Sequence, residues 1–471
     1  SKTGPVDVTL SDGTIKEDLS VLKIGASNVD AFVGVGGPYF VDQDGLDNDG
    51  DGEIDEEGEI QPDGAMGVVL SDLEIALALF KPIVEKDANG QPTGTVDNSS
   101  YYALTASGGV EVVGIDALTI RADILTVAVN GGTDGIGDAA NDPVIDFVQS
   151  ADMDRVNNTT GELGADGVKD NIDAFGSTEG IKIATGTGDD DFEIISFESA
   201  LLQAAGDVTL IIDGFVWASG KFAFSKGTIA QGTLELENGD QPSGDFNLMT
   251  VGGSEINVFV GTGDPDSNGD GMFNAEDDPE GNGAKGLVLT DLEAALALVK
   301  PVVPIDPVTG RPAGAVDNKS YYALSAEASE IALVGVPGVS ISATQLNVEV
   351  NGASQPATGG ASPTGPPPAI DFAASFPADS GLKVLTGPDP DGEGGDPAPF
   401  RIIDFEESFI RASGAVDIEL DFNTDGTPEI SLAVAMSFEQ AVRPNGTKAI
   451  KIALSDDDPT ENTPNLVLGD P

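Results

Sequence analysis

The chain contains a long internal repeat, and this feature limits its possible folds more than any other. Residues 96–104 return as residues 316–324 with eight of nine identities, at an offset of 220 positions. Three further matches follow in the same order: 67–74 with 286–293, 143–147 with 368–372, and 180–183 with 381–384. We therefore expect one unit at 1–224, a second at 225–438, and the start of a truncated third at 439–471. Such repeats are typical of a tandem array in a longer polypeptide.

The apolar residues of the chain mostly alternate with polar ones. Val416, Ile418 and Leu420 are separated by Asp417 and Glu419, a period of two that is typical of a strand with one wet face. Gly and Pro make up 61 and 29 of the 471 residues, which favours many turns and few long helices. A hairpin turn is expected at 213–214, where Asp-Gly separates two apolar runs. The sequence therefore predicts an all-β protein.

One repeated segment is ambiguous between helix and strand. Residues 71–74 have the form of a helix capping box, and the Ala/Leu-rich run that follows favours a helix. However, Leu73, Ile75, Leu77 and Leu79 alternate strictly, as do residues 292–298 in the second unit. A helix would need spacings of three and four to gather these side chains on one face. We therefore predict a strand.

The two units join without a linker rich in Gly, Ser or Pro near Ser225. This continuity favours one elongated fold, either β-solenoid-like or built from stacked β-sheets or sandwiches, with the calcium loops described below inserted between strands. The units differ most between their apolar runs, because loops accept insertions while strands must keep their register.

The charge of the chain excludes several classes of function. It has 81 acidic and 21 basic residues, a net charge of −60, and neither His nor Cys. The acidity argues against nucleic-acid binding, and the missing side chains exclude His-dependent or Cys-dependent catalysis, thiolate zinc sites and disulfides. No apolar run is long enough to predict a membrane span. The expected partners are cations.

The second unit contains a twelve-residue pattern of oxygen-bearing side chains at 266–277, within a loop at 264–278. The expected ligands are Asp266, Asn268 and Asp270 at positions 1, 3 and 5, the carbonyl of Met272 at position 7, Asn274 at position 9 and Asp277 at position 12. Gly271 supplies the sharp turn at position 6. Alternating oxygen ligands around a glycine suit a hard cation with about seven ligands, so the pattern predicts calcium.

The first unit has a related loop at 42–59. The expected ligands there are Asp47, Asp49 and Asp51 at positions 1, 3 and 5, Glu53 at position 7 and Asp55 at position 9, with Asp42 and Asp44 preceding them. Position 12 is Gly58, so the closing carboxylate must come from elsewhere, and the number of ions stays open. Each loop follows a Phe-Val-Gly segment. Two weaker acidic segments, 166–173 and 189–191, are more typical of solvated turns than of metal sites.

The calcium loops carry a resemblance to known families. Residues 266–277 resemble the loops of dockerins, which also close with Asp rather than the Glu of EF-hands. The lead-in Asp42-Gln43-Asp44 resembles the linked loops of thrombospondin type 3 repeats. As a whole, the repeat, the acidity and these loops resemble the long repetitive calcium-binding proteins that bacteria secrete as adhesins, surface layers or fibres. That resemblance implies an extracellular or cell-surface location and assembly with copies of itself or adjacent repeats.

The sequence favours a structural role over catalysis. We expect no enzyme activity, because no nucleophile–base pair or converging acid pair can be named. One alternative is a secreted calcium-dependent β-helix enzyme acting on polysaccharide, which would gather basic and acidic side chains on one face. Another is a carbohydrate-binding adhesin module, which would place aromatic residues such as Tyr39, Phe40 and Phe273 near the calcium loops. For the paired tyrosines at 101–102 and 321–322, we predict one buried and one exposed ring.

Overall fold

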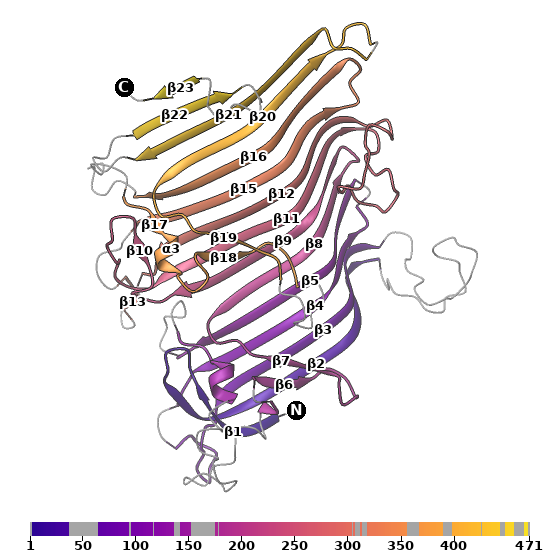
Figure 1. The fold of residues 1–471 in the computed structure, drawn as a ribbon. Coiled ribbons are helices and arrows are strands. Elements are labelled where there is room, and N and C mark those ends of the chain that lie inside the picture. Colours follow the sequence, from indigo (N-terminus) through magenta and orange to yellow (C-terminus); the bar gives the residue numbers. More distant parts are fainter. Residues whose placement is uncertain are drawn as a thin grey trace, which may run out of the picture.

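A computed structural model describes residues 2–36, 65–93, 96–115, 117–135, 142–151, 175–177, 179–303, 305–306, 311–312, 318–355, 367–389, 398–424, 426–442, 448–455 and 466–469. The chain is almost entirely β, with 62% of residues in strands and 3% in helices, so the predicted class is confirmed. Most strands belong to one open antiparallel sheet in which sequence neighbours are also spatial neighbours (Figure 1). The described strands form no solenoid.

The large sheet has fifteen strands. In sheet order they are β1 (Lys2–Thr9), β2 (Ile15–Val35), β3 (Met66–Pro82), β4 (Ser100–Val113), β5 (Leu118–Thr133), β8 (Leu201–Ile212), β9 (Val216–Ile229), β11 (Phe246–Thr262), β12 (Lys285–Pro301), β15 (Ser320–Val334), β16 (Val339–Ser354), β20 (Phe409–Leu420), β21 (Ile430–Val442), β22 (Lys448–Ser455) and β23 (Leu466–Gly469). Asp213 and Gly214 both have positive φ between β8 and β9, as a tight hairpin turn requires.

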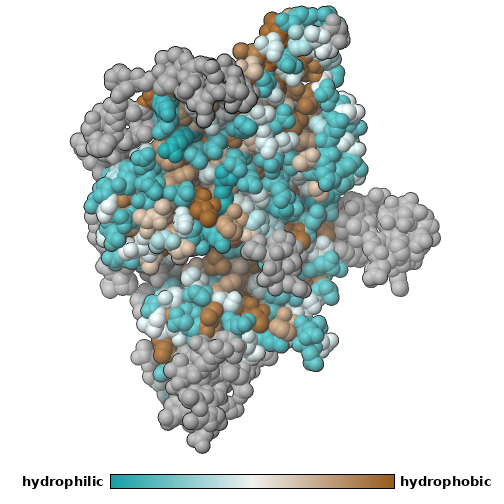
Figure 2. Space-filling view, viewed as in Figure 1, coloured by the Kyte–Doolittle hydropathy of each residue, from teal (hydrophilic) through white to brown (hydrophobic). Residues whose placement is uncertain are grey.

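Short two-stranded sheets and the helix α3 lie on a single face of the large sheet (Figure 1), which we call the covered face. These elements are the β6–β7 hairpin (Ile181–Ala184 and Phe192–Ile195), the β18–β19 hairpin (Leu382–Leu385 and Phe400–Ile403), the pair β10 and β17 (Glu235–Leu236 and Ile370–Asp371), the pair β13 and β14 (Ile305–Asp306 and Arg311–Pro312), and α3 (Phe372–Ser375). Hydrophilic side chains occupy much of this side of the molecule (Figure 2). The opposite side of the large sheet is called the open face.

The ambiguous segments are strands in both units, as predicted. They are β3 and β12, and their burial patterns are the same at every position. The buried residues of β3 are Val69, Ala76, Ala78 and Phe80, whereas Leu77 and Leu79 point to the open face and are half-buried. Small side chains lie under the hairpins because their backbones approach the sheet closely. A Cβ atom at Gly25 would collide with the carbonyl of Ala184, and one at Gly252 with that of Leu385.

Two separate clusters form most of the core on the covered face. The first is built around Phe80, Phe147 and Phe175, whose ring centroids lie 5.8–6.5 Å apart. The second contains Phe246 and Tyr321, with Phe372 also buried in it. The expected boundaries near 225 and 439 lie inside β9 and β21, and the sheet pairing continues across both. The hydrogen-bonded sheet is therefore continuous, while the apolar core is divided.

A row of irregularities crosses the sheet and divides several of its long strands into two segments. Register shifts occur at corresponding places in β2, β3, β5, β11 and β16. Asp72 and Asp291 have φ of 49° and 51° there, which marks a left-handed backbone at equivalent sites of the two units. Beyond this row lie two further small clusters, one around Phe32 and Val69 and one around Phe259 and Val288. The bend in the strands is visible in Figure 1.

Two expectations about side-chain exposure have different outcomes. Tyr101 and Tyr321 are each 2% exposed, while Tyr102 and Tyr322 are 44% and 37% exposed, which confirms the predicted alternation. In contrast, β20 does not have one buried face and one solvent-exposed face. Its acidic residues share the covered face with Arg411, and Ile410 on the open face is 40% exposed. A period of two identifies the strand but does not show which side another element will cover.

Candidate metal loop and the covering hairpins

The predicted calcium loop of the second unit follows β11 and closes on itself through carboxylate–amide hydrogen bonds. The Asp266 carboxylate accepts hydrogen bonds from the backbone amides of Gly269 at 2.6 Å, Asp270 at 3.2 Å and Gly271 at 2.8 Å. Gly269 and Gly271 have φ of 79° and 80°, a conformation that glycine adopts readily. The loop therefore turns tightly around the first of its expected ligands.

The last expected ligand joins the two ends of the loop. Asp277 Oδ1 accepts from the backbone amides of Ser267 at 2.8 Å and Asn268 at 3.3 Å, and its Oδ2 accepts from that of Asn274 at 2.9 Å. Asp270 Oδ2 lies between the side-chain amides of Asn268 and Asn274, at 3.1 and 2.9 Å. The backbone amide of Met272 donates to Asp270 Oδ1 at 3.0 Å, so all six expected ligand residues take part in one connected network.

The fit of this loop to a cation is partial. Its donor set consists of carboxylate and amide oxygens, which are the ligand types that calcium prefers. However, no group of three or more acidic side chains is close enough to hold a metal among the residues that the structure describes. Asp266 and Asp277 are instead engaged by backbone amides. Calcium binding by this loop stays a prediction, and the hydrogen bonds between carboxylates and backbone amides close the loop.

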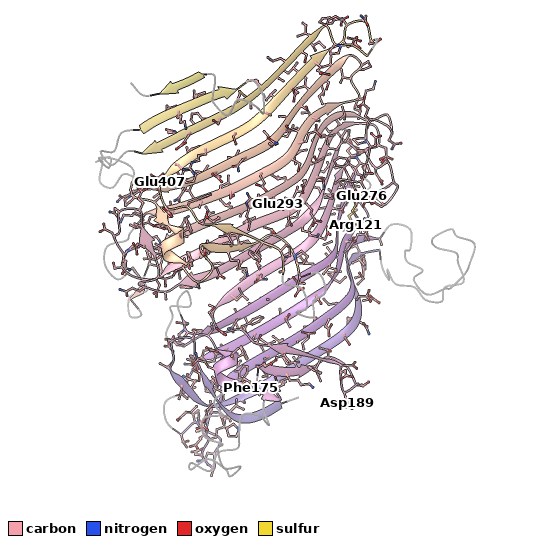
Figure 3. The ribbon with its side chains drawn as sticks, in the orientation of Figure 1. Arg121, Phe175, Asp189, Glu276, Glu293 and Glu407 are labelled. Atoms are coloured by element: carbon pink, nitrogen blue, oxygen red, sulfur yellow. The ribbon has the colours of Figure 1, made fainter. Side chains whose placement is uncertain are left out.

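The loop is fixed to the sheet at its centre. Phe273 is 1% exposed and its ring centroid lies 6.1 Å from that of Phe259 in β11. The Ser219 hydroxyl of β9 donates to the Phe273 carbonyl, and Arg121 of β5 donates to the Asp270 carbonyl at 3.4 Å. The labels of Arg121 and Glu276 mark this region of the molecule in Figure 3. A loop of the second unit therefore contacts a strand of the first.

The other predicted metal sites have different outcomes. The loop at 42–59, with Asp42, Asp44, Asp47, Asp49, Asp51, Glu53 and Asp55, lies outside the described residues, as does the segment 166–173. At 189–191, Asp191 Oδ2 accepts from the backbone amide of Gly188 at 2.6 Å, which is an ordinary turn. Asp189 lies far from Arg121 in Figure 3, so this turn is separate from the loop of the second unit.

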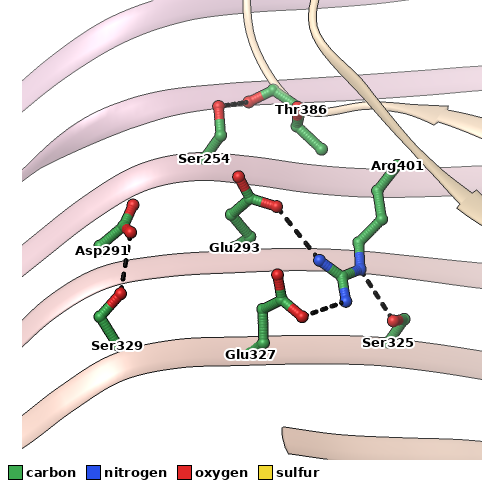
Figure 4. A network of polar contacts seen from close by, with 8 residues as sticks. All are labelled: Ser254, Asp291, Glu293, Ser325, Glu327, Ser329, Thr386 and Arg401. Atoms are coloured by element: carbon green, nitrogen blue, oxygen red, sulfur yellow. Dashed lines mark hydrogen bonds and ion pairs between the residues drawn. The ribbon is translucent and has the colours of Figure 1, made fainter. Parts of the chain in front are cut away.

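A charged network that the sequence did not predict holds the β18–β19 hairpin on the sheet (Figure 4). Arg401 of β19 contacts Glu293 of β12 at 3.1 Å and Glu327 of β15 at 2.9 Å, and its Nε donates to the Ser325 hydroxyl at 2.8 Å. The hydrogen bond from Arg401 lowers the pKa of Glu327, and the same bond raises the pKa of Arg401. One guanidinium thus joins three strands.

The first unit carries a different residue at the same place. Glu193 of β7 corresponds to Arg401 in its hairpin pairing, and Glu74 corresponds to Glu293. The pKa of Glu193 is raised, first by burial and then by repulsion from Glu74. Both hairpins do share a cation–π contact, with Lys182 3.3 Å from the Phe192 ring centroid and Lys383 3.9 Å from that of Phe400. Both units therefore have the same hairpin, but a charge attraction in the second unit is replaced by a repulsion in the first.

A pair of buried asparagines is shared by the two units. The Asn130 side-chain amide donates to the carbonyls of Ile145 at 2.9 Å and Ser199 at 3.0 Å. The Asn351 amide donates to those of Ile370 and Glu407, both at 2.9 Å. Each side chain is 3% exposed. The repeated Val-Asn-Gly sequence was a usable signal for this clamp, which ties the end of a long strand to two loop segments.

Among the described residues, no helix is both long and apolar enough to cross a membrane. Comparisons with protein-family models, with curated proteins and with solved structures gave no match.

Proposed function

We propose that this chain is a structural, calcium-binding repeat segment of an extracellular bacterial fibre, surface layer or adhesin stalk. The observation that carries the proposal is the loop at 264–278, whose oxygen-bearing side chains share one network and whose Phe273 is part of a buried cluster. Asp266, Asn268, Asp270, Asn274 and Asp277, with the Met272 carbonyl, would hold the ion. Bound calcium would supply positive charge at the contact between units.

The position of the loop supports a role in joining units. It lies on the covered face and reaches from β11 across β9 to Arg121 of β5. In a chain of net charge −60, a cation in this loop would reduce the repulsion among the loop's own carboxylates next to that contact. The continuous sheet across the expected boundaries also favours an extended repetitive structure over independent modules.

The carbohydrate-binding alternative has less support. Phe273 was one of the aromatic residues expected near a calcium loop, but its ring is buried against Phe259 and presents no surface to a sugar. Tyr39 and Phe40 lie outside the described residues. No observation in the described parts of the chain favours the enzyme alternative over the structural one.

The experiment that tests the proposal is thermal melting with calcium and with chelator. An ion that binds only the folded state stabilises it by about 2.7 kcal/mol at a hundred times its Kd, so chelation should lower the melting temperature. The double variant Asp266→Asn with Asp270→Asn should bind fewer calcium equivalents and show a smaller calcium-dependent rise in Tm. The matched control, Asp189→Asn with Asp190→Asn, should behave as the unmodified chain. Equal calcium binding and equal melting in all three proteins would refute a site in this loop.

A further inference from the structure

The open face of the large sheet is apolar over most of its width, and its basic residues, Lys81, Lys226 and Lys300, lie near one end of the strands. Cross-strand pairs such as Leu79 with Tyr102 and Leu298 with Tyr322 continue from strand to strand, because the alternate residues that face away from the hairpins are nearly all apolar. Several of these side chains remain well exposed, including Leu202 at 42%, Val251 at 39% and Ile410 at 40%. No described element packs on this side: the contacts of the small sheets are with the other face.

The same face lacks carboxylates. From β3 to β21, the strand acids point to the covered face, as Glu74, Glu293, Glu327 and Glu349 do, and those at the bulges bond to groups there, as Glu255 does to Lys221. No described Asp or Glu in these strands lies at a position whose side chain points to the open face. The chain has 81 acidic residues, so an acid-free surface of this extent marks a surface that is kept out of water.

The extent of the face matches a large interface. Twelve long strands, β2 to β21, lie side by side, and at about 4.8 Å per strand they span about 50 Å. The shortest has 12 residues, about 40 Å at about 3.3 Å per residue. The face therefore covers about 2,000 Å². Overlap of half of it with a partner would bury about 2,000 Å² in total, above the roughly 1,600 Å² of a standard stable complex.

We propose that the open face packs against the open face of a second copy of this chain, as two sheets face to face. Between two chains of charge −60, these surfaces can meet without opposing carboxylates. The face is also self-matching, because β3–β4 and β12–β15 present the same Leu–Tyr pairs. A two-fold axis would therefore place the first unit of one copy on the second unit of the other. This contact does not depend on the proposed calcium site.

The test measures association by sedimentation velocity across a concentration series, in chelator and in calcium. The unmodified chain should sediment as a dimer or larger species in both conditions. Val251→Glu and Ile410→Glu each put a carboxylate into the interface and should weaken association at least about ten-fold. The matched control is Ile402→Glu, because Ile402 is 39% exposed on β19 of the covering hairpin. It should associate as the unmodified chain does.

Circular dichroism and melting of each variant at low concentration separate lost association from lost folding. A folded unmodified chain that stays monomeric at high concentration would overturn the proposal, as would equal weakening by Ile402→Glu. A monomer that instead floats with neutral phosphatidylcholine vesicles, and loses this binding in Val251→Glu, would show that acyl chains cover the face. Association that needs calcium and is lost in the Asp266/Asp270 variant would assign the contact to the loop.

Discussion

Some residues are the same in the two units because a backbone contact depends on them. Others, whose contacts are between charged side chains, differ. Asn130 and Asn351 make the same two hydrogen bonds, and Gly25 and Gly252 admit the same close backbone approach. In contrast, Glu193 stands where the other unit has Arg401. The alternating pattern predicted the strands that contain these residues. It could not predict their partners, because those partners lie on loops and hairpins far along the chain.

The asparagine clamp should be sensitive to the loss of its amide. Asn351→Asp keeps the size of the side chain but replaces two donated hydrogen bonds by a carboxylate facing two carbonyl oxygens. Because the site is buried, we expect a loss of about 3 kcal/mol in the free energy of unfolding. The control is Asn89→Asp at an exposed turn, which should change stability by less than about 0.5 kcal/mol. Denaturant titration measures both, and equal stability of the two variants would contradict the clamp.

Lys23 makes the stability depend on pH in the alkaline range. It donates to the carbonyl of Lys182 at 2.9 Å, and burial lowers its pKa from 10.5 to about 8. Between these values the unfolded chain binds a proton that the folded chain does not, so stability from this group rises with pH from about 8 to 10.5. Lys23→Thr introduces the residue at the equivalent position of β11, Thr250, and should flatten that rise. Parallel pH curves for the two proteins would show that the lysine is not responsible.

At the scale of elements, the long strands were predictable and the covering hairpins were not. β3 and β12 are strands as the period of two indicated, although their Ala/Leu content favours a helix. The hairpins β6–β7 and β18–β19 have only four residues in each strand, too few for a clear period. The docking of β18–β19 on β12 and β15 depends on contacts such as Arg401 with Glu293, which join residues more than one hundred positions apart.

The first hairpin should be stabilised by removing its repulsive carboxylate. Burial and Glu74 raise the pKa of Glu193, so the folded chain keeps its proton to higher pH than the unfolded chain. The contribution of this group to stability is therefore lost as pH rises from 4.5 through the raised pKa. Glu193→Gln should be more stable than the unmodified chain at pH 7 and equal to it well below pH 4.5.

Thermal melting at several pH values checks this expectation. Glu179→Gln is the control, because Glu179 is an exposed carboxylate in the segment just before the same hairpin. It should show no such pH-dependent gain. A lower melting temperature for Glu193→Gln at neutral pH would mean that the charge of Glu193 has a favourable partner.

At the scale of the whole molecule, two separate apolar cores pack against one continuous sheet. The sequence repeat predicted the correspondence of apolar segments, but an uninterrupted sheet with a divided core could not be predicted from it. Whether the apolar runs make one core or two depends on where the hairpins and short helical segments sit. Their positions are set by loops such as 352–368, whose sequences differ between the units.

The divided core should make unfolding local. Phe147 is fully buried in the first cluster and Phe372 in the second, and truncation of either to Ala should cost about 3–5 kcal/mol. Phe147→Ala should increase amide hydrogen exchange mainly in β3 and β4, and Phe372→Ala mainly in β12 and β15. The two variants are controls for each other. An equal increase in all four strands for both variants would show that the continuous sheet unfolds as one unit.

The order of strands has a consequence for arrays of any length. Six antiparallel pairings lead from β2 to β11, and five strands, β3, β4, β5, β8 and β9, lie between them. Because six is even, β2 and β11 run in the same direction, and their last residues, Val35 and Thr262, lie on the same side of the sheet. An odd number would reverse every second copy and send successive loops to opposite edges. Parity alone therefore makes corresponding strands of the two units end on the same side of the sheet.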